Sequence, residues 1–301
     1  MVITIDFETY YDREFSLSKI TTEEYVRDRR FEVIGVGVKV DEGETEWFSG
    51  TEAQTKFWLG KFKWNESLVL AHNMMFDGAI MAWRFDINPK GWLDTLCMGR
   101  AVDGVEVSGS LKNLAERYEV GEKGTEVVNA LGKRRKDFSE EELARYGEYC
   151  RNDVELTYKL FNILRAEFPT KELKVIDLTL RMFTHPVLKL NLPLLEQHLL
   201  DVVERKEKLL EATSASKDDL MSNDKFAQLL IELGVDPPRK ISLTTGREAW
   251  AFAKTDEDFK ALSDHPDDRV QALVAARLGN KTTLEETRTQ RFIDIAKRGL
   301  M

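Results

Sequence analysis

Short apolar runs alternate with amphipathic segments over the first hundred residues of the chain. These runs lie between turn residues, and some of them are rich in β-branched side chains, as is typical of buried strands. The predicted strands are Val2–Asp6, Val33–Val40, Glu44–Phe48, Ser67–Ala71 and Gly91–Thr95. Between them, Thr51–Phe62 and Phe76–Phe85 show a helical spacing of apolar positions. This alternation predicts an α/β fold, a mixed sheet flanked by helices.

A long helix is predicted near the middle of the chain. Ser139 begins a capping box, and an amphipathic run follows it to about Phe168. Pro169 ends this run because proline lacks the amide proton that a helix interior requires. Beyond it the pattern is helical only, with helices at Thr170–Thr184 and Pro193–Glu211.

The change of pattern at Pro169 predicts two domains. Residues 1–169 form the α/β domain, and residues 170–301 form an all-helical region in which 212–224 is a small polar linker. A chain of 301 residues is long enough for both domains and for a buried core.

The composition is that of a soluble globular protein, with 32% charged and 42% hydrophobic residues. No apolar run approaches the roughly 18 residues that span a bilayer, and the start of the chain lacks a secretory-signal pattern. We therefore expect a cytoplasmic protein, in the host cytoplasm if it is viral, with no membrane partner. Cys97 and Cys150 are far apart and have no partners at zinc-ligand spacing, so neither a disulfide framework nor a zinc site is expected.

The net charge of −9 argues against tight non-specific binding to nucleic acid. The acid is unevenly distributed: residues 1–170 hold 23 Lys and Arg against 31 Asp and Glu, and residues 171–301 hold 21 against 22. Bound divalent cations would reverse the local field in the first part. The acidic total is therefore compatible with a nucleic-acid enzyme that works through metals.

Two carboxylates stand at the end of the first predicted strand. Asp6 and Glu8 are two residues apart and point to the same face, while Phe7 turns into the core. Adjacent carboxylates repel, so burying them is costly unless a cation lies between them. Magnesium or manganese suits such oxygen ligands. Taken alone, however, the pair is explained better by a solvated strand end.

Two further motifs carry acids at the start and in the middle of helices. Asp77 follows the strand Ser67–Ala71 and opens a helix, where a carboxylate is also a common cap. Tyr149 and Asp153 are four residues apart on the long helix and share one face. Alone, Tyr149 could pack in the core and Asp153 could pair with Arg151.

In this order the three motifs, D-x-E, N-x-x-F-D and Y-x-x-x-D, resemble the DEDD superfamily of 3′→5′ exonucleases in its tyrosine-bearing branch. Asp94-Thr95 and the helix from Ser110 to Ala115 match supporting positions. The resemblance covers residues 1–168. It implies a ribonuclease-H-like core and the hydrolysis of nucleotides one at a time from a 3′ end.

The resemblance also implies two divalent cations, Mg²⁺ or Mn²⁺, about 3.5–4 Å apart. Asp6 would bind both cations. Glu8 and Asp153 would bind the cation that holds the attacking water, and Asp77 would bind the other. Tyr149 would orient the water, because a phenol with a pKa of about 10 is a poor base. Four flanking residues could contact the terminal nucleotide, although the two aromatic ones fit the core equally well: Phe7, Thr9, Asn73 and Phe76.

A basic run, residues 133–136, precedes the Ser139 cap. Arg134 and Arg135 in this run could contact the phosphates of an incoming strand. A solvated loop explains the run equally well.

The second half resembles the thumb of family A DNA polymerases of the bacteriophage type. The matching stretches are Asn223–Gly234, Lys240–Gly246 and Ala276–Arg288. In that family the thumb follows the exonuclease domain and holds the primer–template duplex by contacts with the DNA backbone. The resemblance implies backbone contacts by five residues, each of which alone also fits an ordinary charged helix: Lys281, Thr282, Thr283, Arg288 and Arg291.

We therefore expect a metal-dependent exonuclease that removes nucleoside 5′-monophosphates from DNA 3′ ends, as the proofreading part of a family A replicative polymerase. Its partners would be a single-stranded DNA 3′ end and a primer–template duplex. The sequence ends before a palm or fingers, so polymerisation is not expected; that part could be a continuation or a separate chain. Two alternatives remain, an RNA- or DNA-trimming exonuclease of the same superfamily and a non-catalytic module that binds primer–template.

Overall fold

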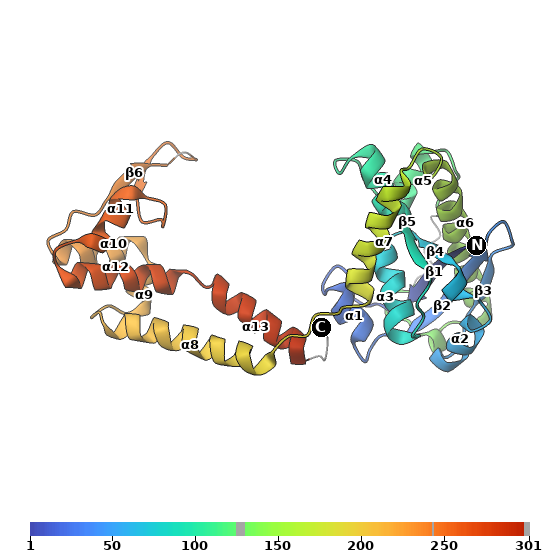
Figure 1. The fold of residues 1–301 in the computed structure, drawn as a ribbon, viewed down its shortest axis with the longest axis horizontal. Helices are drawn as coiled ribbons and strands as arrows, with labels where there is room; N and C mark the ends of the chain where they lie inside the picture. The colour runs from blue at the N-terminus through green and yellow to red at the C-terminus, as the bar shows by residue number, and fades with distance from the viewer. Residues whose placement is uncertain (125–129, 243, 298–301) are drawn as a thin grey trace. The chain divides into compact units, whose positions relative to one another are not determined.

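The computed structural model describes residues 1–124, 130–242 and 244–297. They fall into two units, Met1–Pro186 and Val187–Met301, each with a hydrophobic core of its own. The first unit contains a sheet with helices packed on it, and the second is mostly helical (Figure 1). The α/β class predicted from the alternating pattern is confirmed.

The sheet of the first unit has five strands in the order β3-β2-β1-β4-β5. Their bounds are β1 (Val2–Thr9), β2 (Val33–Val40), β3 (Glu46–Phe48), β4 (Leu68–Ala71) and β5 (Gly91–Asp94). β1 pairs antiparallel with β2 and parallel with β4, and β4 pairs parallel with β5, so the sheet is mixed. β1 runs to Thr9, beyond the predicted end at Asp6, and both Asp6 and Glu8 lie within it.

Helices pack against the sheet over two hydrophobic clusters. One cluster joins Ile3 and Ile5 of β1 to residues of α3, and the other joins Leu70 of β4 to residues of α5 and α6. The helices of this unit are α1 (Thr22–Arg27), α2 (Glu52–Leu59), α3 (Met74–Arg84), α4 (Thr95–Asp103), α5 (Leu111–Arg117), α6 (Glu140–Leu164) and α7 (Thr170–Thr184), with 3₁₀ turns η1 (Trp64–Glu66) and η2 (Arg135–Asp137).

Helix α6 packs very close to the sheet because each of the two has a glycine where it faces the other. A Cβ on Gly37 of β2 would lie 2.9 Å from Cys150 Sγ of α6, and a Cβ on Gly147 of α6 would lie 2.6 Å from the ring of Trp47 of β3. Larger residues at either position would push the helix away. The close approach lets α6 carry its polar residues to β1.

Helix α7 belongs to the first unit. It packs against α3 and β5: the Trp83 indole N–H donates to the Thr184 carbonyl (2.9 Å), and the Trp92 backbone N–H donates to Asp177 (2.8 Å). The compact unit therefore ends at Pro186, whereas the predicted domain boundary lies at Pro169. α6 already ends at Leu164, and Pro169 is the N-cap of α7, which returns to the same core.

In the second unit, α8 (Leu192–Glu211) packs along α12 (Asp268–Lys281) and α13 (Leu284–Lys297) (Figure 1). The remaining elements are α9 (Lys217–Met221), α10 (Asn223–Glu232), β6 (Arg239–Ile241), β7 (Glu248–Trp250), α11 (Glu257–Ala261) and the 3₁₀ turn η3 (Leu262–Asp264). The prediction of an all-helical region missed the β6–β7 hairpin. The predicted polar linker contains α9, which the Ser216 capping box begins.

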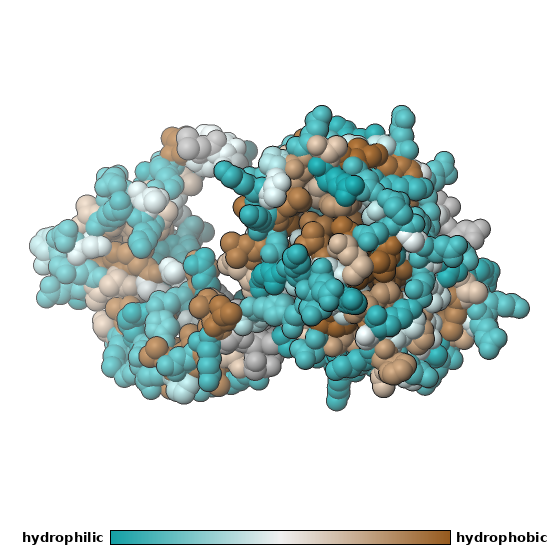
Figure 2. Space-filling model, turned by 45° about the vertical axis from the view of Figure 1, so that its right-hand side comes forward, coloured by the Kyte–Doolittle hydropathy of each residue, from teal (hydrophilic) through white to brown (hydrophobic). Residues whose placement is uncertain are grey.

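Hydrophilic side chains cover most of both units in the view of Figure 2, with hydrophobic patches between them. None of the helices in the described ranges combines the length and the apolar character that crossing a membrane requires.

Candidate metal centre and active site

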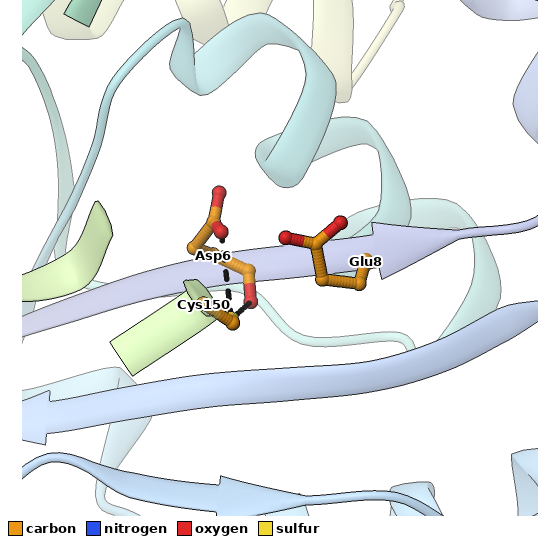
Figure 3. A group of neighbouring side chains, drawn as sticks. All are labelled: Asp6, Glu8 and Cys150. Atoms are coloured by element: carbon orange, nitrogen blue, oxygen red, sulfur yellow. Dashed lines mark hydrogen bonds between the residues drawn. The ribbon is translucent and has the colours of Figure 1, made fainter. Parts of the chain in front are cut away.

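Strand β1 presents two carboxylates on one face. Asp6 and Glu8 lie on the same side of the strand, and the Glu8 carboxylate turns toward Asp6 (Figure 3). One ligand atom each of Asp6, Glu8 and Cys150 lies within 4.8 Å of the other two. Phe7 points the opposite way, because side chains alternate along a strand, and stacks on Phe85 with ring centroids 5.8 Å apart.

Helix α3 brings a third carboxylate to the same strand. The parallel pairing of β1 with β4 covers only Val2 to Thr4, so further along β1 the backbone on that side has no strand partner. Asp77 takes this place: its Oδ1 accepts a hydrogen bond from the Phe7 N–H at 3.0 Å. The Asp77 side chain is buried, with 2% of its surface exposed.

Asp94 fixes the turn that leads from β4 into α3. Asn73 at this turn has a left-handed backbone (φ 70°, ψ 53°), and its N–H donates to Asp94 Oδ1 at 3.1 Å. The same oxygen accepts from the Leu96 N–H at 2.8 Å and caps α4. Because both helix starts are tied to one buried carboxylate, the first turn of α3 holds Asp77 against β1.

Helix α6 contributes the fourth carboxylate together with two tyrosines. Asp153 is buried; its Oδ2 pairs with Lys123 Nζ at 2.5 Å, and Tyr149 favours the ionised form of this carboxylate by lowering its pKa. Asp153 Oδ1 is buried without a hydrogen-bond partner among the residues that the structure describes. One helical turn before Tyr149, the buried Tyr146 donates a hydrogen bond to Glu8.

The crowding of acids shows in their pKa values. Burial, followed by the charge of Asp153, raises the pKa of Asp6 to about 7. Burial, followed by the charge of Asp6, raises the pKa of Glu8 to about 8. The pKa of Asp77 lies well above its ordinary value for the same two reasons, burial and Asp6. Burial also raises the pKa of Asp153, although Lys123 opposes the shift.

These residues fit a divalent cation. Four carboxylates supply hard oxygen ligands of the kind that Mg²⁺ and Mn²⁺ prefer. The unpartnered Asp153 Oδ1 is a buried acceptor that a cation would satisfy, and like charges close together cannot all ionise without one.

Comparison with known proteins agrees with this chemistry. Residues 52–169 match a family described as a 3′-5′ exonuclease, the type associated with DNA polymerase A. Residues 52–169 therefore belong to a 3′-5′ exonuclease domain. The matched segment includes Asp77, Tyr149 and Asp153, whereas Asp6 and Glu8 precede it and reach the site through β1.

Among solved structures, the chain is similar to NrnC of Brucella melitensis, with 16% identity over 61% of this chain and 83% of that chain and a TM-score of 0.47. It is also similar to the POL domain of Pol1 from M. smegmatis in complex with DNA primer-template and dNTP, with 14% identity over 98% of this chain and 45% of that one and a TM-score of 0.48. The catalytic core of RRP6 from Trypanosoma brucei gives 9% identity over 98% and 74% of the two chains, with a TM-score of 0.44. These similarities are too remote to define a function. No curated protein sequence matches the chain significantly.

The predicted nucleotide contacts of the exonuclease domain fall into different surroundings. Phe7 is 4% exposed and belongs to the core, and its backbone N–H donates to Asp77. Thr9 is buried, and its hydroxyl lies 2.9 Å from the Tyr25 hydroxyl. Phe76 is half-buried, 6.0 Å from the Tyr25 ring, and Asn73 is exposed.

The predicted basic run is not simply a solvated loop. Arg134 pairs with Glu32 at 2.7 Å, and its guanidinium lies 4.1 Å from the centre of the Tyr10 ring. The Arg135 N–H donates to the same Glu32 carboxylate at 3.0 Å. Tyr10 is two residues beyond Glu8, so the run lies beside the end of the strand that carries the acids.

In the second unit, two of the five predicted DNA contacts line one pocket. The pocket holds about 280 Å³ and is lined by Lys281 and Thr282 together with other cationic and aromatic residues, among them Lys240, Trp250, Lys254 and Arg277. The predicted contacts Thr283, Arg288 and Arg291 are exposed.

Sequence reasoning missed three residues of the site: Lys123, Tyr146 and Cys150. Tyr146 precedes Asp153 by seven residues, and this spacing places them on one helix face, so periodicity could have found it. Lys123 lies in an irregular segment 30 residues before Asp153, and no local signal connects them.

Proposed function

We propose that this chain is a metal-dependent 3′→5′ exonuclease that releases nucleoside 5′-monophosphates from DNA 3′ ends. The observation that carries the proposal is the meeting of four acids from three separate elements: Asp6 and Glu8 of β1, Asp77 of α3 and Asp153 of α6. Their mutual elevation of pKa indicates that they share one electrostatic site.

These four acids would hold two divalent cations, Mg²⁺ or Mn²⁺. When bound, such cations stabilise charge on the attacking and leaving oxygens of a phosphodiester and make water more acidic.

The protein's own groups would position the reactants. Burial raises the pKa of Tyr149, so its phenol stays protonated at neutral pH and orients by hydrogen bonding rather than acting as a base. Tyr146 holds Glu8 in place through its hydroxyl. Lys123 would supply positive charge beside Asp153, where a scissile phosphate brings negative charge.

The 3′ end would enter past the turn at Asn73 and the half-buried Phe76. Both follow β4 directly and stand at the start of the helix that carries Asp77. Arg134, held over Tyr10 beside the end of β1, would contact a phosphate further along the strand. A single strand suits such a site because its bases can stack on exposed aromatic rings.

The second unit would bind the sugar–phosphate backbone of a primer–template duplex. The chain would then be the proofreading part of a family A polymerase. Lys281 and Thr282 support this role because they share a pocket with three further cations. The exposed Thr283, just before α13, and the exposed Arg288 and Arg291 of α13 would add further contacts to the DNA backbone. Palm and fingers, continuous or separate, would be the partner.

The test uses single-stranded DNA oligomers labelled at the 5′ end, with Mg²⁺ or Mn²⁺ present. The wild-type chain should shorten them stepwise from the 3′ end and release 5′-monophosphates. The double variant Asp6→Ala/Glu8→Ala should lose this activity while keeping its fold, and Glu66→Ala, an exposed acid of the same unit, should not.

Robust hydrolysis by the double variant would contradict the assignment of the site. Matched RNA oligomers distinguish DNA proofreading from RNA trimming, since equal or faster RNA shortening would favour trimming. Absence of divalent-cation binding at millimolar Mg²⁺ would leave a non-catalytic primer–template module as the better explanation.

A further inference from the structure

Cys150 is fully buried between α6 and the sheet, and its thiol contacts one of the carboxylates of the site. Its Sγ is 3.4 Å from Asp6 Oδ2 and 3.4 Å from the Asp6 backbone oxygen. Figure 3 shows the thiol reaching β1 from α6 beside Asp6, with Glu8 next along the strand. The exonuclease chemistry proposed above uses oxygen ligands only and gives this sulfur no role.

The spacing of these atoms suits a tetrahedral metal site. Zinc bonds of about 2.3 Å to sulfur and 2.1 Å to oxygen place the two ligand atoms about 3.6 Å apart at a tetrahedral angle. The observed distance from Sγ to Asp6 Oδ2 is 3.4 Å. Asp6, Glu8 and Cys150 all fall within 4.8 Å of one another, so small side-chain rotations would complete the geometry.

A fourth ligand atom is available independently of this trio. Asp153 lies three residues beyond Cys150 on α6 and is 6% exposed. Its Oδ1 is a buried acceptor with no hydrogen-bond partner in the described ranges. Its charge raises the pKa of Asp6, Glu8 and Cys150.

We propose that Asp6, Glu8 and Cys150 form a binding site for a thiophilic divalent cation of the zinc class, with Asp153 as the fourth ligand. On binding, a metal–sulfur bond replaces the S–H bond and the thiol proton passes to solvent. No electron is transferred. The thiolate is the ligand that distinguishes this mode, because Mg²⁺ and Mn²⁺ prefer oxygen whereas Zn²⁺ and Cd²⁺ accept sulfur.

This mode would exclude the all-oxygen mode because both use Asp6 and Glu8. Nitrogen, oxygen and sulfur ligands bind Zn²⁺ more tightly than Mn²⁺, and the sulfur ligand adds to the difference. A trace of zinc would therefore displace magnesium and fill the nuclease site in a different geometry. The proposal concerns cation binding and stands whether or not the chain hydrolyses DNA.

The first experiment uses Cd²⁺ as a probe, because cadmium–thiolate bonds give an ultraviolet charge-transfer band that cadmium–oxygen bonds lack. Cys97→Ser retains Cys150 as the one thiol, and Cys150→Ser retains Cys97 as a matched control. The band should form in Cys97→Ser, vanish in Cys150→Ser and disappear when Zn²⁺ is added. Its persistence in Cys150→Ser, or its loss in Cys97→Ser, would overturn the proposal.

Calorimetric titration gives a second readout. Replacing the thiol by a hydroxyl should weaken Zn²⁺ binding at least about tenfold while changing Mg²⁺ binding less than about threefold, since only zinc gains from sulfur. An equal change for both cations would mean that Cys150 acts only through the packing of α6, and would contradict the proposal.

X-ray absorption at the zinc edge keeps the proposal testable if Cys150→Ser does not fold. Zinc-loaded Cys97→Ser should show one sulfur neighbour at about 2.3 Å. A shell of oxygen or nitrogen alone would refute the site. Failure of the nuclease assay with Mg²⁺ would leave all three results unaffected, so the two proposals fail separately.

Discussion

The two units of this chain bury charges of opposite sign, and different surroundings compensate these charges. In the first unit, four carboxylates converge, and Asp153 leaves one buried oxygen unpartnered among the described residues. In the second, Arg277 is 1% exposed, and its Nε likewise has no partner in the part of the chain that the structure describes. Both units thus hold buried charge whose hydrogen-bonding capacity is incomplete.

The difference lies in what surrounds the charge. The acids of the first unit are close enough to raise one another's pKa, so a small, doubly charged cation gives the largest relief. The Arg277 guanidinium instead lies over the rings of Phe226 (4.4 Å) and Phe252 (5.1 Å) and donates to the carbonyls of Leu220 and Ser222. Burial lowers the pKa of Arg277 to about 10, which still leaves it charged at neutral pH.

Under the proposed function, the first unit would need bound cations before it could approach a phosphate. The second unit would offer the cationic residues of its pocket directly. Four predictions test this comparison.

The largest effect is expected from Asp153→Asn. The substitution removes a charge from the cation site and leaves Lys123 without its partner, so Mg²⁺-dependent DNA hydrolysis should fall by roughly 10³-fold, equivalent to several kcal/mol of transition-state stabilisation. The measurement is kcat/KM on single-stranded DNA. Glu148→Gln, an exposed acid on the same helix, should change it less than about twofold. Retention of activity by Asp153→Asn would remove the first half of the comparison.

Arg277→Met should destabilise the second unit by about 3 kcal/mol, because two backbone carbonyls and Asn223 lose their donor in a buried place. Hydrogen exchange of the α10 and α12 amides measures the stability of the second unit separately from that of the first unit. Arg269→Met, whose exposed guanidinium pairs with Asp267, should cost less than about 1 kcal/mol. Similar losses of unfolding free energy in both variants would mean that the buried contacts of Arg277 do not stabilise the second unit more than an exposed ion pair does.

Lys281→Ala should weaken the binding of duplex DNA a few-fold and reduce the slope of log Kd against log salt by about 1, since one phosphate contact is lost. The measurement is fluorescence anisotropy at several salt concentrations. Lys208→Ala, which removes an exposed lysine paired with Glu204, should leave the slope unchanged. If both variants behave alike, the pocket of the second unit does not bind the DNA backbone.

The smallest effect concerns pH. In the metal-free protein the pKa values of Asp6 (about 7) and Glu8 (about 8) lie above their ordinary values, so the folded state holds protons that the unfolded state releases. Their contribution to stability is fully present below about pH 4 and is lost as the pH rises through 7 to 8. Mg²⁺ should therefore raise Tm by more degrees at about pH 9 than at about pH 5. Asp6→Asn/Glu8→Gln should remove this pH dependence, and an equal rise at both pH values would show that the cation binds elsewhere.

The sequence was informative where structure depends on local periodicity. The apolar alternation of β1 located Asp6 and Glu8 on one face, and the four-residue spacing of Tyr149 and Asp153 placed them together on α6. The order of the motifs then predicted the exonuclease domain that the family match confirms.

Local sequence patterns could not predict contacts between segments that are distant in the chain. Cys150 looked isolated because zinc-ligand spacings consider only nearby residues, whereas its neighbour Asp6 is 144 positions away. The domain boundary was predicted at Pro169, although this proline caps the start of α7, which packs back onto β5. The hairpin β6–β7 has three-residue strands, too short for a period of two to stand out.

The hydrogen bond from the Phe7 backbone to Asp77 has a consequence for how this fold can vary. An anchor made by the main chain is indifferent to the side chain at position 7, so the residue there can drift among core-filling types without releasing the carboxylate. An alanine scan along β1 would overlook the anchor entirely. Only proline, which has no amide hydrogen, or an ester substituted for that peptide bond would expose it.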